Sequence, residues 1–176
     1  MPVPTHMDGI LFFGIMAKSE AALLGYTSLF LENIGASLVN KSEVIDFTSF
    51  SLYYNQEMGD TVLKQLVLTD KVICCEKLRE LKCRSNTLEQ EHAKEDKRIF
   101  NLDPGYINPH QVVLASTKFS PHRTPLGAGL WSELTLLRYK KKWHPLIWTY
   151  RDYCCPPFLT FLENIRQDIN ALLRKQ

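Results

Sequence analysis

Several features that would assign a protein to a class at once are missing from this sequence. No apolar run approaches the roughly 18–20 residues that a membrane-spanning helix requires. The first residues, MPVPTHMDGI, contain no cationic segment of the kind that opens a secretory signal peptide. Neither sign of charge is in excess, because the formal net charge is only +2. These absences predict no membrane partner and disfavour nucleic acid as a partner.

The five cysteines lack the spacing of a metal or redox motif. There is no Cys-x-x-Cys, their number is odd and two pairs are vicinal, so a disulfide framework is not expected. A zinc site would need cysteines and histidines to converge from distant parts of the chain, which their spacing does not favour. We therefore expect a protein of the reducing cytoplasm.

Motifs of nucleotide-binding loops and nucleophilic enzymes are missing as well. The stretch PLGAGL at 125–130 has neither the spacing of a phosphate-binding loop nor that of a dinucleotide fingerprint. No order of Ser, His and Asp, or of Cys and His, indicates a nucleophilic triad. The sequence therefore names no reaction.

What is present is the composition of an ordinary folded domain. Hydrophobic residues make up 45% of the chain and charged residues 23%, which is enough to bury a core. The length of 176 residues favours one domain, which we expect at residues 8–176. Residues 1–7 contain a His-Met pair that is typical of a cloning remnant, and we expect them to form a disordered tail or tag remnant.

Hydrophobic spacing predicts alternating strands and helices. The apolar run at 10–17 is typical of a buried strand. Ser19 has the chemistry of an N-cap for a helix whose apolar stripe ends at Ile34, just before Gly35. Further strands are predicted at 36–47, 61–73, 97–103, 111–118 and 129–143, a loop or short helix at 50–59, and helices at 75–94 and 156–173.

The order of these elements predicts an α+β fold. Its first six elements follow the order of a ferredoxin-like split unit, β-α-β-β-α-β. We therefore expect a mixed, mostly antiparallel sheet with helices packed on it, in which a C-terminal helix is added to the ferredoxin-like core.

The stretch RIFNLDPGY at 98–106 has two interpretations. Asp103, Pro104 and Gly105 have the chemistry of a tight turn, since proline fixes φ, glycine accepts a positive φ and aspartate bonds the local backbone. Asp103 is also a carboxylate that a site could use. We expect a turn between two strands that at the same time positions Asn101 and Asp103.

A second group of polar residues follows between 118 and 133. His122 is a histidine, the residue type most often used for proton transfer, and Arg123 offers a bidentate fork for a phosphate or a carboxylate. Glu133 stands in a strand that is otherwise half buried, where a buried carboxylate needs a cation or a hydrogen-bond donor. The alternative interpretation places His122 and Glu133 in solvent, without a role.

The strip YKKKWHPLIWTY at 139–150 combines basic and aromatic residues. Such a charge run most often forms a solvated face. Its aromatic residues could also stack on the bases of single-stranded RNA, because base stacking needs only exposed rings beside cations.

Seven blocks occur in the following order: FFGIMA, DFTSFSLYYNQEMG, LKCRSNTLE, RIFNLDPGYI, VVLASTKFSPHR, GLWSELTL and WTYRDY. Together they resemble a family of small prokaryotic proteins known only as a domain of unknown function. The resemblance extends from about Ile10 to about Asn164, so it implies one intact domain, and it supplies no reaction. The chain departs from the family pattern at Thr124-Pro125, where an aromatic continuation of the strand is expected.

Polar residues fill most of the positions on which these blocks fall, which is typical of a site more than of a core. Our main hypothesis is a cleft, enzymatic or only binding, for an anionic phosphate-like or nucleotide-like ligand, with a divalent cation as an option. The candidates for catalysis are Asp103, His122 and Glu133. The candidates for the cation are Glu57, Asp103 and Glu133. The candidates for ligand binding are Tyr54, Glu57, Asn86, Asn101, Tyr106, Lys118, Arg123 and Asp152.

Two other hypotheses stay open. The polar blocks could be structural ion pairs in a non-enzymatic protein-interaction or regulatory module. The basic and aromatic strip could belong to an RNA-binding accessory protein. A dry, fully paired Glu133–Arg123 or Asp103–Arg123 contact with no adjoining cavity would favour the interaction module.

Overall fold

A nine-stranded sheet forms the centre of the protein in the computed structural model, which describes residues 8–174. The strands follow the order β2-β4-β1-β5-β6-β8-β7, and β3 also pairs with β4 and β9 with β8. Each of these pairings is antiparallel. The predicted tail at 1–7 lies outside the described residues. The strands are β1 (Asp8–Ala17), β2 (Leu38–Lys41), β3 (Ile45–Asp46), β4 (Leu63–Cys74), β5 (Phe100–Ile107), β6 (Gln111–Ser116), β7 (Thr124–Gly127), β8 (Leu130–Tyr139) and β9 (Lys142–Pro145).

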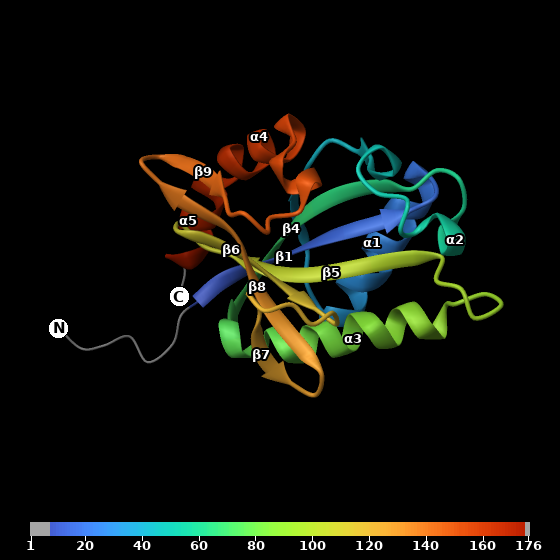
Figure 1. The fold of residues 1–176 in the computed structure, drawn as a ribbon. Helices are drawn as coiled ribbons and strands as arrows, with labels where there is room; N and C mark the ends of the chain where they lie inside the picture. Colours follow the sequence, from blue (N-terminus) through green and yellow to red (C-terminus); the bar gives the residue numbers. More distant parts are fainter. Residues whose placement is uncertain (1–7, 175–176) are drawn as a thin grey trace.

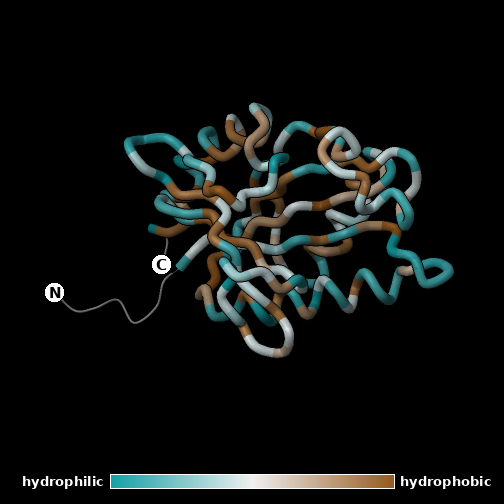
Figure 2. Tube along the Cα trace, viewed as in Figure 1, coloured by the Kyte–Doolittle hydropathy of each residue, from teal (hydrophilic) through white to brown (hydrophobic). Residues whose placement is uncertain are grey.

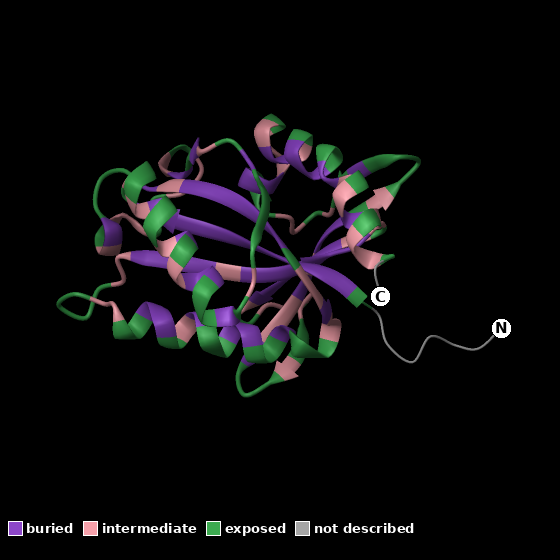
Figure 3. Ribbon diagram, turned by 180° about the vertical axis from the view of Figure 1, so that it is seen from behind, coloured by how far each residue is buried: buried purple, intermediate pink, exposed green. Residues whose placement is uncertain are grey.

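Helices cover both faces of the sheet (Figure 1). Alternate residues of β1 belong to two different apolar cores, one on each face of the sheet, because successive side chains of a strand point to opposite faces. Leu11, Phe13 and Ile15 pack with α1 and α3, whereas Ile10 and Phe12 pack with α4 and α5. Figure 3 shows the central strands as buried, and Figure 2 shows apolar residues along them. The helices are α1 (Glu20–Ile34), α2 (Asn55–Met58), α3 (Leu78–Glu91), α4 (Pro156–Asn164) and α5 (Arg166–Leu173).

The prediction of α1 is confirmed at both of its ends. The Ser19 hydroxyl accepts a hydrogen bond from the Ala22 N–H at 3.2 Å, as an N-cap does. Gly35 follows the helix at φ 61°, a left-handed conformation that glycine adopts without strain. Leu23, Phe30 and Ile34 are buried on one side of the helix, so the predicted apolar stripe faces the sheet.

The predicted turn at Asp103-Pro104-Gly105 is wrong, because these residues lie inside β5. All of β5 pairs with β1, which places Asp103 opposite Gly14 and Gly105 opposite Phe12. The chain reverses at 108–110 instead, where the Asn108 side chain accepts hydrogen bonds from two backbone N–H groups. Pairing with a long neighbouring strand has overridden the local turn chemistry.

Other predicted elements have different limits in the structure. The predicted strand at 129–143 is a hairpin of β8 and β9, and a bulge at Thr135 interrupts its alternation. The predicted strand at 36–47 is divided into β2 and β3, and the predicted last helix is divided at Ile165 into α4 and α5. The predicted helix at 75–94 starts only at Leu78, after a 3-10 turn, and ends at Glu91. None of the helices described between residues 8 and 174 is long and apolar enough to cross a membrane.

Candidate functional site

The sheet opens between β5 and β6. Strand β1 pairs with β5 from Phe100 to Ile107, whereas β6 pairs only with Gly105–Ile107. A Cβ on Gly105 would lie 2.4 Å from the carbonyl oxygen of Val113, so glycine is required where the two strands meet. Pro104, which has no N–H to donate, stands at the first position without a β6 partner. The Pro-Gly pair therefore marks the point where the sheet divides.

Side chains of α3 take the place of the missing strand. The Leu102 N–H donates to Glu89 Oε1 at 2.7 Å, and Lys82 Nζ donates to the Leu102 carbonyl at 2.7 Å. Lys82 is 3% exposed and Glu89 4%. Burial disfavours a carboxylate, so the pKa of Glu89 is raised. One lysine and one glutamate on the inward side of α3 thus satisfy both backbone groups of Leu102, in the part of β5 that β6 does not pair with.

A cleft of about 720 Å³ occupies this opening, on the face of the sheet that α4 and α5 cover elsewhere. Side chains of five strands form its floor, and α3 and the segments around 47–54, 116–118 and 148–153 form its walls. Six cations and four carboxylates line it, which leaves a formal surplus of two positive charges. These residues are Lys64, Lys82, Arg98, Lys118, Arg123, Arg151, Glu89, Asp103, Glu133 and Asp152.

Asp103 faces the cleft from β5 as an ionised carboxylate. It accepts hydrogen bonds from Lys82 Nζ at 3.2 Å and from Asn101 Nδ2 at 2.9 Å. Burial by itself would raise its pKa, but the charges of Lys82 and Lys64 outweigh burial and hold the pKa below its ordinary value. The side chain is 26% exposed, so lone pairs of the carboxylate remain accessible from the cleft.

A buried ion pair joins β4 to the segment before α4. Lys64 Nζ lies 2.6 Å from Asp152 Oδ2, and the two side chains are 4% and 3% exposed. The Lys64 ammonium also lies 4.6 Å from the centre of the Tyr153 ring, a favourable contact between a cation and an aromatic face. These contacts fix the 3-10 turn Arg151–Cys154 against the sheet floor.

Arg98 closes the end of the cleft next to α2. Its guanidinium donates to both carboxylate oxygens of Glu57, at 2.6 and 2.7 Å, and to Asn101 Oδ1 at 3.0 Å. The hydrogen bonds from Arg98 lower the pKa of Glu57. The Tyr54 ring lies 5.3 Å from the guanidinium, and burial raises the pKa of the Tyr54 hydroxyl. Glu57 therefore serves to hold Arg98 in place.

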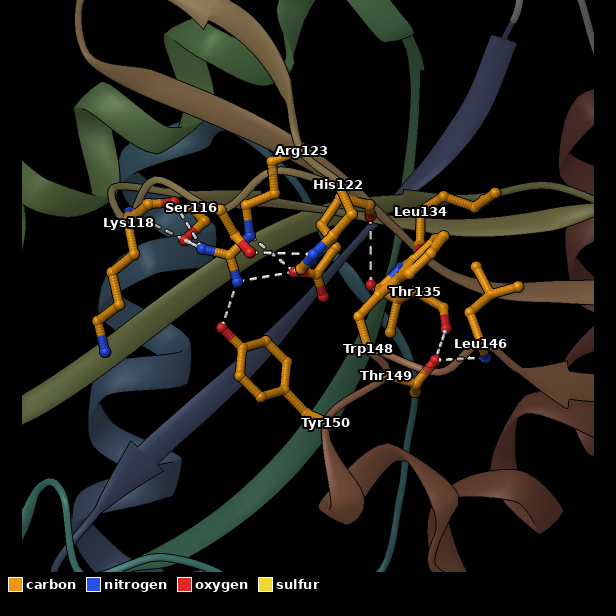
Figure 4. Close-up of polar contacts among 12 residues, drawn as sticks. Ser116, Lys118, His122, Arg123, Leu134, Thr135, Leu146, Trp148, Thr149 and Tyr150 are labelled. Carbon is orange, nitrogen blue, oxygen red and sulfur yellow. Dashed lines mark hydrogen bonds and ion pairs between the residues drawn. The ribbon is translucent and has the colours of Figure 1, made fainter.

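Arg123 and His122 both contact Glu133 at a further part of the cleft wall. Figure 4 shows Arg123 and His122 with their neighbours. Arg123 Nε lies 2.7 Å from Glu133 Oε2, and His122 Nε2 lies 2.9 Å from the same oxygen. Glu133 is 1% exposed, so the interpretation that places it in solvent is wrong. The remaining hydrogen bonds of the Arg123 guanidinium go to Ser116 Oγ, the Lys118 carbonyl and the Tyr150 hydroxyl.

Three neighbours hold the imidazole of His122 in place. It stacks on Trp148 with ring centres 4.8 Å apart and planes at 11°. Its Nδ1 lies 3.0 Å from Ser120 Oγ, so both ring nitrogens have partners. Trp148 in turn donates from Nε1 to the Leu134 carbonyl at 2.8 Å. His122 thereby supports the carboxylate of Glu133 from behind the cleft.

Two cations at the cleft, Lys118 and Arg151, have no carboxylate partner among residues 8–174. The Lys118 ammonium lies over the ring of Tyr53, 3.5 Å from its centre. Tyr53 is 56% exposed, so this pair stands at the mouth of the cleft. One of the two surplus positive charges of the cleft therefore stands at its mouth, where a ligand would enter.

The structure brings most of the predicted site residues together. His122 and Glu57 stand behind the cleft lining, in contact with Glu133 and Arg98. Tyr106 lies on the opposite face of the sheet, where it packs in the core under α1 and α3. The predicted residues that line the cleft are Tyr54, Asn86, Asn101, Asp103, Lys118, Arg123, Glu133 and Asp152.

The three carboxylates considered for a divalent cation are not brought to one point. Glu57 binds Arg98, Asp103 binds Lys82, and Glu133 binds Arg123. Within the described part of the chain, no group of three or more His, Cys, Asp or Glu residues is placed to hold a metal ion.

Sequence reasoning did not select Lys64, Lys82 or Arg98, although all three line the cleft. Two of them carry a recognisable signal. Lys64 interrupts an apolar strand, and Lys82 falls on the same side of α3 as Leu78 and Leu81, where a charge needs a partner. Arg98 lies in the short connection between α3 and β5 and carries no such signal.

A family model described as a domain of unknown function, DUF4416, matches residues 8–168 of the chain. The match covers β1 to the first residues of α5, and so the whole cleft. No curated protein matches the chain.

Proposed function

Since the chain belongs to the DUF4416 family of unknown function, we propose from the site alone that its cleft binds a small anionic ligand, phosphate-like or nucleotide-like. The observation that carries this proposal is the Lys118 ammonium. It stands at the cleft mouth over Tyr53 and has no carboxylate partner in the described chain. An exposed ammonium at the mouth of a cleft attracts an anion from solution.

The size and the lining of the cleft support a small molecule. Its volume of about 720 Å³ falls among the values of small-molecule sites. Aromatic rings of Tyr53, Tyr54 and Trp148 line it beside the cations, which suits a ligand with a flat group as well as an anion.

Binding is better supported than a particular reaction. Asp103 is the group best placed for chemistry, because it is ionised and partly exposed. His122 has a partner at each ring nitrogen and acts as a positioning residue for Glu133. We therefore propose Asp103 as a ligand contact. A divalent cation would have to arrive with the phosphate of the ligand, since the carboxylates of the cleft are engaged by Lys82 and Arg123.

The hypothesis of a module without a ligand is less well supported. The Glu133–Arg123 pair that it requires is present and buried. However, both residues line an open cleft, whereas a purely structural pair needs no adjoining cavity.

The RNA-binding hypothesis has less support still, because the strip at 139–150 does not form one surface. Trp143 is 8% exposed, and Trp148 stacks on His122. Tyr139, 63% exposed, stands beside His144 at the hairpin end of β8, whereas Tyr150, 43% exposed, accepts a hydrogen bond from Arg123 at the cleft. A row of exposed rings for successive bases is therefore missing from this strip.

Binding of the complete chain to inorganic phosphate and to adenosine monophosphate, measured by calorimetry and thermal shift, tests the proposal. We expect both to raise the melting temperature, because a ligand of the folded state stabilises it. Lys118→Gln should weaken binding about tenfold or more, the effect of losing a hydrogen bond to a charged group. Lys18→Gln, at an exposed lysine outside the cleft, is the matched control. If no phosphate compound binds at millimolar concentration, the proposal is wrong.

We also infer that β1 to β5 form the ferredoxin-like unit that the sequence predicts. The order β2-β4-β1-β5 with antiparallel neighbours supports this. So does the position of both connecting helices, α1 and α3, in the same apolar core. Strands β6 to β9 would then be an extension, and the cleft would lie at the junction of unit and extension.

A further inference from the structure

Two buried polar atoms of cleft residues, Glu133 Oε1 and Tyr153 Oη, have no hydrogen-bond partner among residues 8–174. Glu133 is 1% exposed and Tyr153 0%. Both residues belong to the cleft lining. Buried polar groups in folded proteins almost always have a partner, so an unpartnered pair beside a cavity indicates where a bound molecule completes the structure.

The surroundings of Glu133 specify what kind of group is missing. Its other oxygen, Oε2, already lies within hydrogen-bond distance of Arg123 Nε and His122 Nε2. The guanidinium of Arg123 neutralises the charge of the carboxylate and is itself fully engaged. A second cation at Oε1 would lie close to Arg123 and be repelled. The missing partner is therefore an uncharged N–H or O–H donor.

Tyr153 offers the complementary chemistry. Its hydroxyl lies over the backbone of Gly14, where a Cβ would come within 3.3 Å of it. Gly14 pairs with Asp103, so the hydroxyl stands above the part of the floor that holds this carboxylate. Burial raises the pKa of Tyr153 well above its ordinary value, so the hydroxyl keeps its proton and can donate it.

We propose that the ligand of this cleft carries, in addition to its anionic group, uncharged polar groups that donate to Glu133 Oε1 and accept from the Tyr153 hydroxyl. This inference rests on the proposed function and narrows it. The ligand is a phosphorylated polar compound, of the class of sugar phosphates and nucleotides. Inorganic phosphate or a phosphate on an apolar chain leaves both buried atoms unsatisfied.

The test compares inorganic phosphate, ribose phosphate and adenosine monophosphate on the complete chain and on Tyr153→Phe. We expect at least one of the organic phosphates to bind about tenfold tighter than inorganic phosphate. Tyr153→Phe should weaken that ligand about 3- to 10-fold, the effect of one lost hydrogen bond between uncharged groups, and leave inorganic phosphate unchanged. Tyr26→Phe removes a hydroxyl on the opposite face of the sheet, and should change none of these affinities.

The stability of the ligand-free variant gives a second, independent readout. Because the Tyr153 hydroxyl has no partner in the described chain, Tyr153→Phe should melt at the same temperature as the parent protein or higher. A clear loss of stability, or a failure to fold, would show that the hydroxyl already has a partner and would overturn the inference. If inorganic phosphate binds as tightly as the organic phosphates, the inference fails while the proposed function stands. If none of the three binds, the proposed function itself fails.

Discussion

At the scale of single residues, the Lys64–Asp152 ion pair is buried on both sides. Asp152→Ala would leave the Lys64 ammonium buried without a carboxylate. We expect the free energy of unfolding to fall by about 3–5 kcal/mol, since an uncompensated buried charge is strongly destabilising. The double variant Lys64→Met, Asp152→Ala should lose less than Asp152→Ala alone, as measured by urea denaturation. A double variant that is no more stable than the single one would contradict this account.

Gly105 is a second residue whose chemistry is fixed by its neighbours. In Gly105→Ala the new methyl group would lie 2.4 Å from the Val113 carbonyl oxygen and 2.8 Å from the Phe12 ring. We expect a loss of about 1–3 kcal/mol, the usual cost of an overpacked core position, measured by thermal denaturation. Gly25→Ala in the middle of α1 is the control. Its methyl group meets nothing within 4 Å, so this variant should gain about 0.5–1 kcal/mol.

Residues with local signals could be predicted from the sequence, and those that depend on distant partners could not. Ser19 and Gly35 cap their own helix, so their roles can be predicted from the few residues that adjoin them in the sequence. The partner of Asp103, by contrast, is Lys82, which follows from the packing of α3 against the opened edge of β5. The grouping of His122, Arg123 and Glu133 could be expected, because they lie within 12 positions of one another across one hairpin of the sheet.

At the scale of elements, α3 acts as a substitute for a strand. Glu89→Ala would leave the Leu102 N–H buried without its acceptor. We expect a loss of about 1–3 kcal/mol and faster hydrogen exchange at the Leu102 amide, the signs of an unsatisfied donor. Glu89→Gln keeps an oxygen for this bond and should retain most of the stability. Unchanged exchange at Leu102 in Glu89→Ala would show that the contact is dispensable.

The limits of the elements follow the same division between local and distant causes. The long apolar strands β1 and β4 could be predicted because their own composition specifies them. Asp103, Pro104 and Gly105 have the composition of a turn, but eight successive pairs with β1 hold them in a strand. The division of the last helix at Ile165 leaves the apolar stripe intact, so hydrophobic spacing carries no sign of it.

At the scale of the whole molecule, the ion pairs of the cleft make stability depend on pH. Hydrogen bonds from Arg98 lower the folded-state pKa of Glu57, so this carboxyl stabilises the fold above its unfolded pKa. The contribution is lost as pH falls through the folded pKa. We therefore expect the free energy of unfolding to decrease between about pH 5 and pH 2.

Glu57→Gln isolates this contribution. The variant should flatten the decrease by at most about 1 kcal/mol, because the Glu57–Arg98 pair is partly exposed to solvent. Glu89 contributes in the opposite sense, since its pKa is raised, and it is unchanged in the variant. Glu43→Gln, at an exposed position, is the control. Urea denaturation at a series of pH values measures both, and identical profiles for Glu57→Gln and the parent would refute the assignment.

The gap between β5 and β6 also bears on whether a strand of another molecule can pair with the opened sheet. A strand edge that lies open invites a strand from another molecule to pair with it. Here Pro104 has no proton to offer, and the backbone of Leu102 is already bound by Lys82 and Glu89. The residues that hold the cleft open thus also block the open edge of β5 against pairing with a strand of another molecule.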